Sequence, residues 1–148
     1  MKKIILGLII LLISGCAASP QKSALIGTCK KPIKEQHIWE GTGGVYAGRY
    51  LITSNDSPQL GRMRSVLGEL STTMRVKVVR VLKDWDGSYG PFLRVEVEII
   101  DGPHAGLIAD VPACVPYHPR PRWIELCTLD PNALVFNDEV VKDCKERN

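Results

Sequence analysis

Residues 92–100 read FLRVEVEII, and this stretch gives the strongest indication of how the chain folds. Aliphatic and charged side chains alternate along it, which is the two-residue period of a β-strand. We therefore expect a strand that packs one face on a core and exposes its charged face to water. The packed face would hold Leu93, Val95, Val97 and Ile99, and the wet face Arg94, Glu96 and Glu98.

The preceding stretch, MRVKVVRVLKD at 74–84, indicates a second strand with an irregularity. Its valines keep one phase of the alternation up to Val78 and the other phase from Val79 onward. A β-bulge at this point would absorb the slip and bend the strand. Between the two strands, KDWDGSYGP at 83–91 supplies turn residues, but it is too long for a two-residue hairpin loop.

The neighbouring segments add short strands on either side. The turn DGPHAG at 101–106 has glycines available for positive φ, and LIADVP at 107–112 then predicts a third strand. Upstream, a helix beginning at Ser57 competes with a strand over 65–70. Two glycines within that helix would each weaken it by roughly 1 kcal/mol relative to alanine, so we expect a loop followed by a strand.

This succession of segments resembles the bacterial SH3-like domain. The segments LITS at 51–54, VLGEL at 66–70, VKVVRV at 76–81 and the closing DGPHAG turn follow the order and spacing of that family. The resemblance covers residues 43–112, and Asp110 stands where the family has its closing tryptophan. It implies a small β-barrel that binds peptide or cell-wall peptidoglycan through aromatic side chains in a groove between loops.

The first sixteen residues, MKKIILGLIILLISGC, have the order of a secretory signal. The apolar run after Lys2 and Lys3 is shorter than the roughly 20 residues that a membrane-spanning helix needs. The closing ISGC resembles the lipobox of bacterial lipoproteins, in which the cysteine is acylated and becomes the mature N-terminus; the alternative is an ordinary cleaved signal. The resemblance implies a signal peptide at 1–15 and a lipid anchor on Cys16. In a Gram-negative cell the protein would then sit in the outer membrane, facing the periplasm.

Removal of residues 1–15 takes away most of the apparent basicity of the chain. Seventeen lysines and arginines then face sixteen acidic residues, and the basic pair at 30–31 has no larger cluster around it. A nucleic-acid partner is therefore not expected. The sequence contains no motif that predicts a cofactor.

Four cysteines follow Cys16 in the sequence: Cys29, Cys114, Cys127 and Cys144. An even number in an exported chain favours two disulfides over free thiols, and three pairings are open. One of them, Cys127 with Cys144, would staple the C-terminal segment to the strand before it. Zinc binding is the weaker alternative, because Cys114 and His118 lack a paired Cys-x-x-Cys.

The segments outside the barrel have different compositions. Residues 16–36 are small, polar and proline-containing, which predicts a lipidated tether ahead of a barrel at 37–112. Residues 113–148 begin with a proline-rich strap that should lie on the surface. They end in NDEVVKDCKERN, which predicts a short helix with Asn137 as its N-cap.

No catalytic signature accompanies this mainly β architecture, so we expect a binding module rather than an enzyme. Trp85 and Tyr89 are the predicted contact residues, because they lie in a turn-rich loop, whereas Tyr50 and Phe92 are expected to pack. The partner would be an envelope protein, a peptide or peptidoglycan. The alternatives are a structural accessory lipoprotein of an envelope or secretion assembly and, less supported, a histidine-based enzyme or metalloprotein using His37, His104 or His118.

Overall fold

The computed structural model describes residues 18–41, 47–54, 63–114 and 120–144. These residues form β-strands and no helix, so the expectation of a mainly β chain is confirmed. The strands in order are β1 (Ser19–Gln21), β2 (Cys29–Pro32), β3 (Gln36–Gly41), β4 (Tyr50–Thr53), β5 (Met63–Leu70), β6 (Val76–Asp86), β7 (Gly90–Ile99), β8 (Ile108–Asp110), β9 (Ile124–Leu126), β10 (Val135–Phe136) and β11 (Val141–Asp143).

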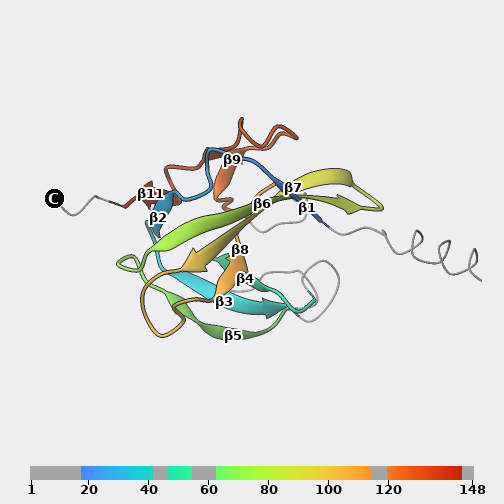
Figure 1. Ribbon diagram of the computed structural model, residues 1–148. Helices are drawn as coiled ribbons and strands as arrows, with labels where there is room; N and C mark the ends of the chain where they lie inside the picture. Colours follow the sequence, from blue (N-terminus) through green and yellow to red (C-terminus); the bar gives the residue numbers. More distant parts are fainter. Residues whose placement is uncertain (1–17, 42–46, 55–62, 115–119, 145–148) are drawn as a thin grey trace, which may run out of the picture.

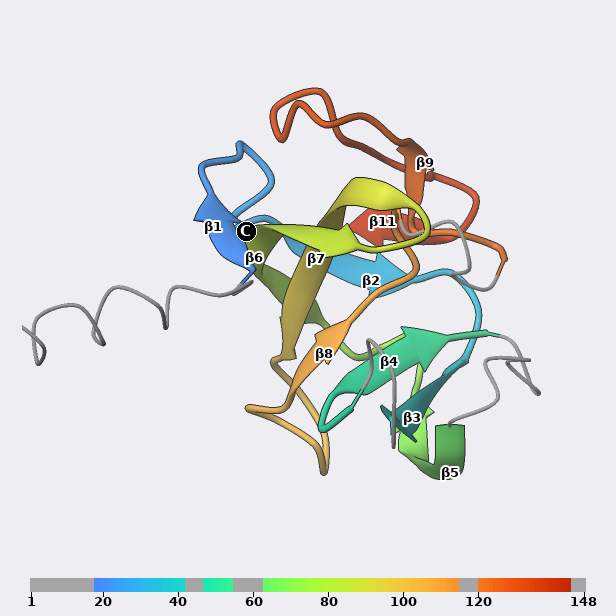
Figure 2. The ribbon, with the colours of Figure 1, turned by 90° about the vertical axis from the view of Figure 1, so that its right-hand side faces the viewer.

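Most of these strands belong to one strongly bent sheet (Figures 1 and 2). Its order is β11-β2-β6-β7-β8-β4-β3-β5, with β1 also paired to β6, while β9 and β10 form a separate two-stranded sheet. The pairings are antiparallel except that of β4 with β8. No pairing in the described part of the chain joins β11 to β5, so the described sheet is not a closed barrel.

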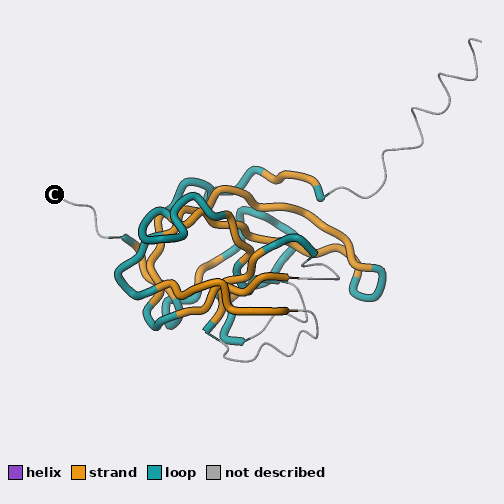
Figure 3. Tube along the Cα trace, turned by 90° about the horizontal axis from the view of Figure 1, so that it is seen from below, coloured by secondary structure: helices purple, strands orange, loops and turns teal. Residues whose placement is uncertain are grey.

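The β6–β7 hairpin is the longest pairing in the sheet and confirms two details predicted from the sequence. Its register shifts between Val78 and Arg80, which places a bulge at the residue where the valine pattern changes phase. The hairpin closes with three residues between Asp86 and Gly90, and Gly90 has a φ of 79°. Figure 3 shows the tip extending past the other described strands.

The core lies on the aliphatic face of this hairpin. The four side chains predicted to pack, Leu93, Val95, Val97 and Ile99, are all buried. The C-terminal segment adds to the core: Trp123 is the largest fully buried side chain, and its Nε1 donates a hydrogen bond of 3.3 Å to Oε1 of buried Gln36. Parts of the C-terminal segment therefore belong to the core, whereas Arg120 and Pro121 of the predicted strap are exposed, and residues 115–119 lie outside the described residues.

The opposite face of β7 is charged but not wet, so that prediction is wrong for two of its three residues. Arg94 and Glu96 keep only 3% and 7% of their surface exposed, and Asp110 of β8 keeps 3%. Asp110 is the residue directly opposite Glu96 in the β7–β8 pairing. The charged half of the alternation therefore belongs to a buried ion network.

Arg94 is the centre of this network. Its Nη2 donates to Glu96 Oε1 at 2.7 Å and to Asp110 Oδ1 at 3.0 Å, and its Nη1 donates to Asp84 Oδ2 at 3.0 Å. Arg80 Nε lies 2.6 Å from the other oxygen of Glu96. One guanidinium thus connects carboxylates on β6, β7 and β8, which satisfies its donors in place of water.

Both ends of the described chain also depart from the expected tether and helix. Residues 18–36 include β1 and β2, which pair with β6 instead of forming a free tether. At the other end, Asn137 Oδ1 accepts a hydrogen bond from the Glu139 amide, as an N-cap would. The chain then forms a turn and continues as β11, because Val140 and Val141 are buried in the core beside β2.

A disulfide joins Cys29 of β2 to Cys144, which follows β11. It closes a loop with a sequence separation of 115 residues and ties the two ends of the described chain together. The staple between Cys127 and Cys144, which the sequence left open, is therefore wrong.

We expect Arg94→Met to lower the unfolding free energy by about 3–5 kcal/mol, because it leaves three carboxylates near one another without their shared cation. Chemical denaturation of the purified variant measures the loss. Arg75→Met is the matched control, since Arg75 makes a two-point contact with Asp101 on the surface, where water screens the charges. Equal losses in the two variants would contradict a central role for Arg94.

Candidate functional site

The tip of the β6–β7 hairpin presents two aromatic side chains to solvent. Trp85 is 66% exposed and Tyr89 is 55% exposed, which confirms the exposure predicted for both. Trp85 lies directly across the hairpin from Pro91. Asp86 fixes the turn between them, because its Oδ1 accepts hydrogen bonds from the amides of Ser88 (2.8 Å) and Tyr89 (3.2 Å).

The other aromatic residues weighed from the sequence are placed differently. Phe92 is buried, and Tyr50 packs against the core while partly exposed, so the expectation that both pack is confirmed. Tyr46 lies outside the described residues. The aromatic surface available to a partner in the described chain is therefore concentrated at the hairpin tip.

A shallow groove of about 190 Å³ opens beside the tip. Pro91 and Phe92 line it from the hairpin, and Thr128 and Leu129 line it from the segment after β9. In Figures 1 and 2 the segment after β9 lies above the β6–β7 hairpin. We call this cavity the tip groove; its remaining lining residues are Cys114 and Cys127.

The two cysteines of the tip groove are a hydrogen-bonded pair of free thiols. Arg122 Nη1 also donates to Cys127 Sγ at 3.8 Å. The hydrogen bond from Cys114 lowers the pKa of Cys127 to about 7, with a further contribution from the Arg122 charge. The same hydrogen bond, together with burial, raises the pKa of the Cys114 thiol. These shifts favour Cys127 over Cys114 as the thiolate of the pair.

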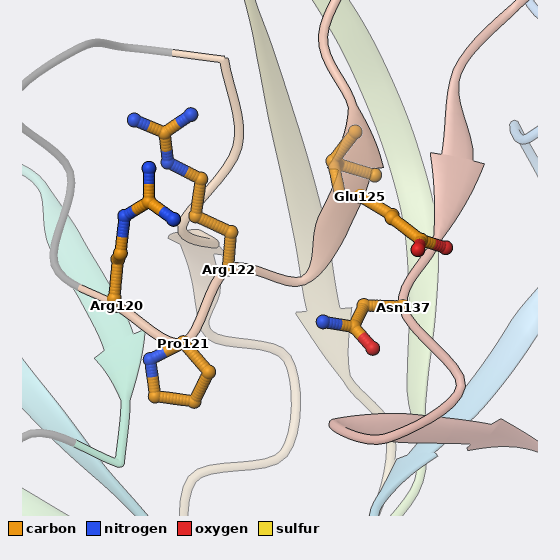
Figure 4. Close-up of a pocket in the computed structure, with 6 residues that line it drawn as sticks. Arg120, Pro121, Arg122, Glu125 and Asn137 are labelled. Atoms are coloured by element: carbon orange, nitrogen blue, oxygen red, sulfur yellow. The ribbon is translucent and has the colours of Figure 1, made fainter.

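A larger, open pocket of about 550 Å³ is lined by Arg122 together with Arg120 and Pro121 (Figure 4). The guanidinium groups of Arg120 and Arg122 lie on one side of it, and Glu125 and Asn137 lie on the other. The sequence did not predict that these arginines line a pocket, because the stretch PRPRW is also typical of a stiff connector. The pocket gives this region a local positive charge close to Cys127.

Asp110, where the SH3-like resemblance predicts an aromatic side chain, does not line the tip groove. Burial raises the pKa of its carboxyl to about 6, and the nearby Arg94 charge opposes that shift. The side chain is held by Arg94 within the sheet. Its role in the described structure is to complete the ion network.

The histidines weighed as alternative ligands lie on different segments of the chain. His37 is on β3, and the ring of His104 lies so close to Gly68 of β5 that a Cβ there would collide with it. His118 is outside the described residues. In the part of the chain that the structure describes, no group of three or more His, Cys, Asp or Glu side chains is arranged to hold a metal ion.

Cys16 and the signal before it also lie outside the described residues. Within the described ranges, no helix has the length and apolar character needed to cross a bilayer. Comparison of the chain with protein-family models, with curated proteins and with solved structures finds no match.

We expect the exported chain to contain two disulfides, Cys29–Cys144 and Cys114–Cys127, since each crosslink typically stabilises a small domain by 2 to 4 kcal/mol. The two remaining thiols line the same groove, which favours this pairing. Thiol counting and peptide mapping of denatured, unreduced Cys16→Ser protein should find no free thiol. Four reactive thiols with bound zinc, or a different pairing, would disprove it.

Proposed function

We propose that the protein is a lipid-anchored envelope lipoprotein whose hairpin tip and tip groove bind a protein or peptide partner. The observation that carries this proposal is the exposure of Trp85 and Tyr89 at the end of a long hairpin, beside an apolar groove. A folded chain loses favourable free energy by leaving so much aromatic surface in water. A partner that covers it recovers that free energy.

The sequence of the first sixteen residues supports the proposed location at a membrane surface. ISGC ending at Cys16 has the arrangement of a lipobox, and its apolar run has the length of a signal rather than of a membrane-spanning helix. The Cys29–Cys144 disulfide also fits an oxidising compartment outside the cytosol. An acylated Cys16 would hold the chain at the membrane, and β1, which begins at Ser19, would hold the folded part close to the bilayer surface.

The nature of the surface supports a protein or peptide as the partner. Pro91, Phe92 and Leu129 give the tip groove apolar walls, which suit hydrophobic side chains. Aromatic anchors next to a groove are typical of the residues that contribute most to protein interfaces. Peptidoglycan would be held mainly by polar contacts to sugar hydroxyls, so it is the competing result of the binding test.

The scaffold alternative differs in which surface it uses. An accessory lipoprotein would bury a broad apolar face in its assembly and would not depend on the hairpin tip. Further exposed aliphatic side chains are spread over several strands, including Leu67 on β5 and Val135 on β10. These positions therefore serve as controls that distinguish the two functions.

We also propose that residues 37–112 are a divergent SH3-like domain. The segments that carry the resemblance contribute to β4, β5 and β6 in the expected order, and the bulged β6–β7 hairpin supports it. The ion network around Asp110 would then replace the aromatic packing of the family at the closing strand.

We expect Cys16→Ser to abolish acylation and to move the protein from the membrane fraction to the soluble envelope fraction. The physical reason is that a doubly acylated cysteine anchors stably, whereas no helix in the described ranges is long and apolar enough to take its place. Fractionation after growth with a labelled fatty acid measures both effects. If unlabelled wild-type protein stays in the membrane, the lipoprotein proposal is wrong.

We expect Trp85→Ala to reduce partner capture at least about tenfold, because truncation of an aromatic hot spot costs over about 2 kcal/mol of binding. Tyr89→Ala should weaken capture in the same direction. Leu67→Ala is the control, since Leu67 is exposed on β5, away from the tip (Figure 1). The measurement is quantitative recovery of crosslinked envelope proteins and, in parallel, of purified peptidoglycan.

Folding of each variant is checked by thermal unfolding, because Trp85→Ala would lower the melting temperature if Trp85 packed against the hairpin. Loss of peptidoglycan alone would replace the protein partner with a cell-wall partner. If Trp85→Ala and Tyr89→Ala fold normally and retain every wild-type partner, the hairpin tip is not the binding site.

A further inference from the structure

The thiol pair of the tip groove has features that a structural pair of cysteines does not require. Cys127 is exposed, whereas Cys114 is partly buried. Both side chains line the tip groove, and the positive charges of Arg122 and Arg120 act on Cys127. The groove leaves Cys127 open to a molecule approaching from solvent.

We propose that Cys114 and Cys127 form a thiol–disulfide exchange site. In the reduced pair Cys127 attacks a disulfide and Cys114 resolves the mixed disulfide, which leaves the Cys114–Cys127 disulfide that we expect in the exported chain. The substrate class is a solvent-accessible disulfide of a small molecule or a partner protein, preferably one that carries acidic groups. This inference goes beyond the proposed binding function and does not depend on which partner the hairpin tip holds.

Exposure and electrostatics assign the attacking role to Cys127. The thiolate is the nucleophile in thiol–disulfide exchange. A cysteine whose pKa lies near the ambient pH combines a large thiolate fraction with high intrinsic reactivity. The Cys114 hydrogen bond and the Arg122 contact at 3.8 Å both stabilise negative charge on Cys127 Sγ. Cys114 stays protonated until its partner has reacted, because its own pKa is raised.

The exchange balances in two steps. In the first, the Cys127 thiolate forms a bond to one sulfur of the substrate disulfide, the substrate S–S bond breaks, and the second substrate sulfur leaves as a thiolate. In the second, Cys114 loses its proton to solvent and attacks Cys127 Sγ, which releases the first substrate sulfur. The pair gives up two electrons and becomes a disulfide, and the substrate disulfide accepts them and becomes two thiols.

The arginines favour acidic substrates at this site. Arg120 and Arg122 both contribute their positive charge to the surroundings of Cys127. A carboxylate attached to the incoming disulfide would be attracted to the same guanidinium groups. Glutathione disulfide, which carries carboxylates, and the uncharged hydroxyethyl disulfide are therefore the two probes that separate charge from general reactivity.

The test uses the chain with Cys16→Ser, so that Cys16 contributes no thiol, after mild reduction that frees Cys114 and Cys127. We expect Cys114→Ser to retain glutathione on Cys127 as a stable mixed disulfide, and Cys127→Ser to react at least about tenfold more slowly at pH 7. The reduced wild type should end as the Cys114–Cys127 disulfide with no glutathione attached. Mass spectrometry with peptide mapping distinguishes these products.

Two charge variants provide the matched control. Arg122→Met should slow alkylation of Cys127 by iodoacetamide at pH 7 and shift the half-maximal rate above its wild-type value near pH 7. Arg120→Met should have a smaller effect on alkylation but should reduce the preference for glutathione disulfide over hydroxyethyl disulfide. A variant that merely loosened the fold would expose both cysteines and speed up their alkylation.

The proposal is overturned if Cys114→Ser and Cys127→Ser react at the same rate, or if reduced wild-type protein keeps glutathione instead of closing the internal disulfide. Equal reaction of the charged and uncharged probes in every variant would overturn the acidic preference. None of these readouts uses partner capture by Trp85, so failure of the exchange site and failure of the binding function are distinguishable.

Discussion

The guanidinium of Arg94 connects three strands through three carboxylates, and the geometry of the hairpin depends on this contact. Asp84, Glu96 and Asp110 would repel one another if they shared the space beneath the hairpin without a cation. With Arg94 between them, the polar face of β7 can be covered while its other face packs on the core. The hairpin is therefore held on both faces, although only one of them is hydrophobic.

This support has a consequence for the proposed binding surface. Asp84 accepts from Arg94 and is the residue immediately before Trp85 in β6. The ion network therefore extends to the residue before the exposed tip. The strand β6, which carries Trp85, is held in place up to that residue. The Asp86 turn orders the other end of the tip. A binding surface built on a fixed hairpin loses less conformational entropy when a partner docks than a free loop would.

The sequence predicted the hairpin better than its surroundings. The alternation at 92–100 and the phase change at Val79 determine local geometry, and both agree with the structure. The alternation shows which side chains share a face, but it does not show whether that face is covered. Covering that face requires Asp110, which lies on a separate strand. In the sequence, Asp110 was noted only as a residue that replaces the closing tryptophan of the SH3-like pattern.

The chain ends were harder to predict for a related reason. The Asn137 signal describes the first hydrogen bond of a turn, and a turn that leads into a strand begins in the same way as a helix. The outcome was decided by pairing of β11 with β2, which is far away in the sequence. The exposure of Trp85 and Tyr89 followed from local turn chemistry, whereas the contact between Cys114 and Cys127 and the position of Arg122 depend on the tertiary fold.

Native-state hydrogen exchange of the β6–β7 hairpin tests the central claim most directly, namely that the buried ion network holds the tip in place. The amides of residues 81–85 should exchange only through openings of high free energy, comparable to those of the core residues 93–97. In Arg94→Met, protection of residues 81–85 should fall more than protection of β3. If these amides exchange rapidly in the wild type, or if Arg94→Met leaves their protection unchanged, the network does not hold the hairpin.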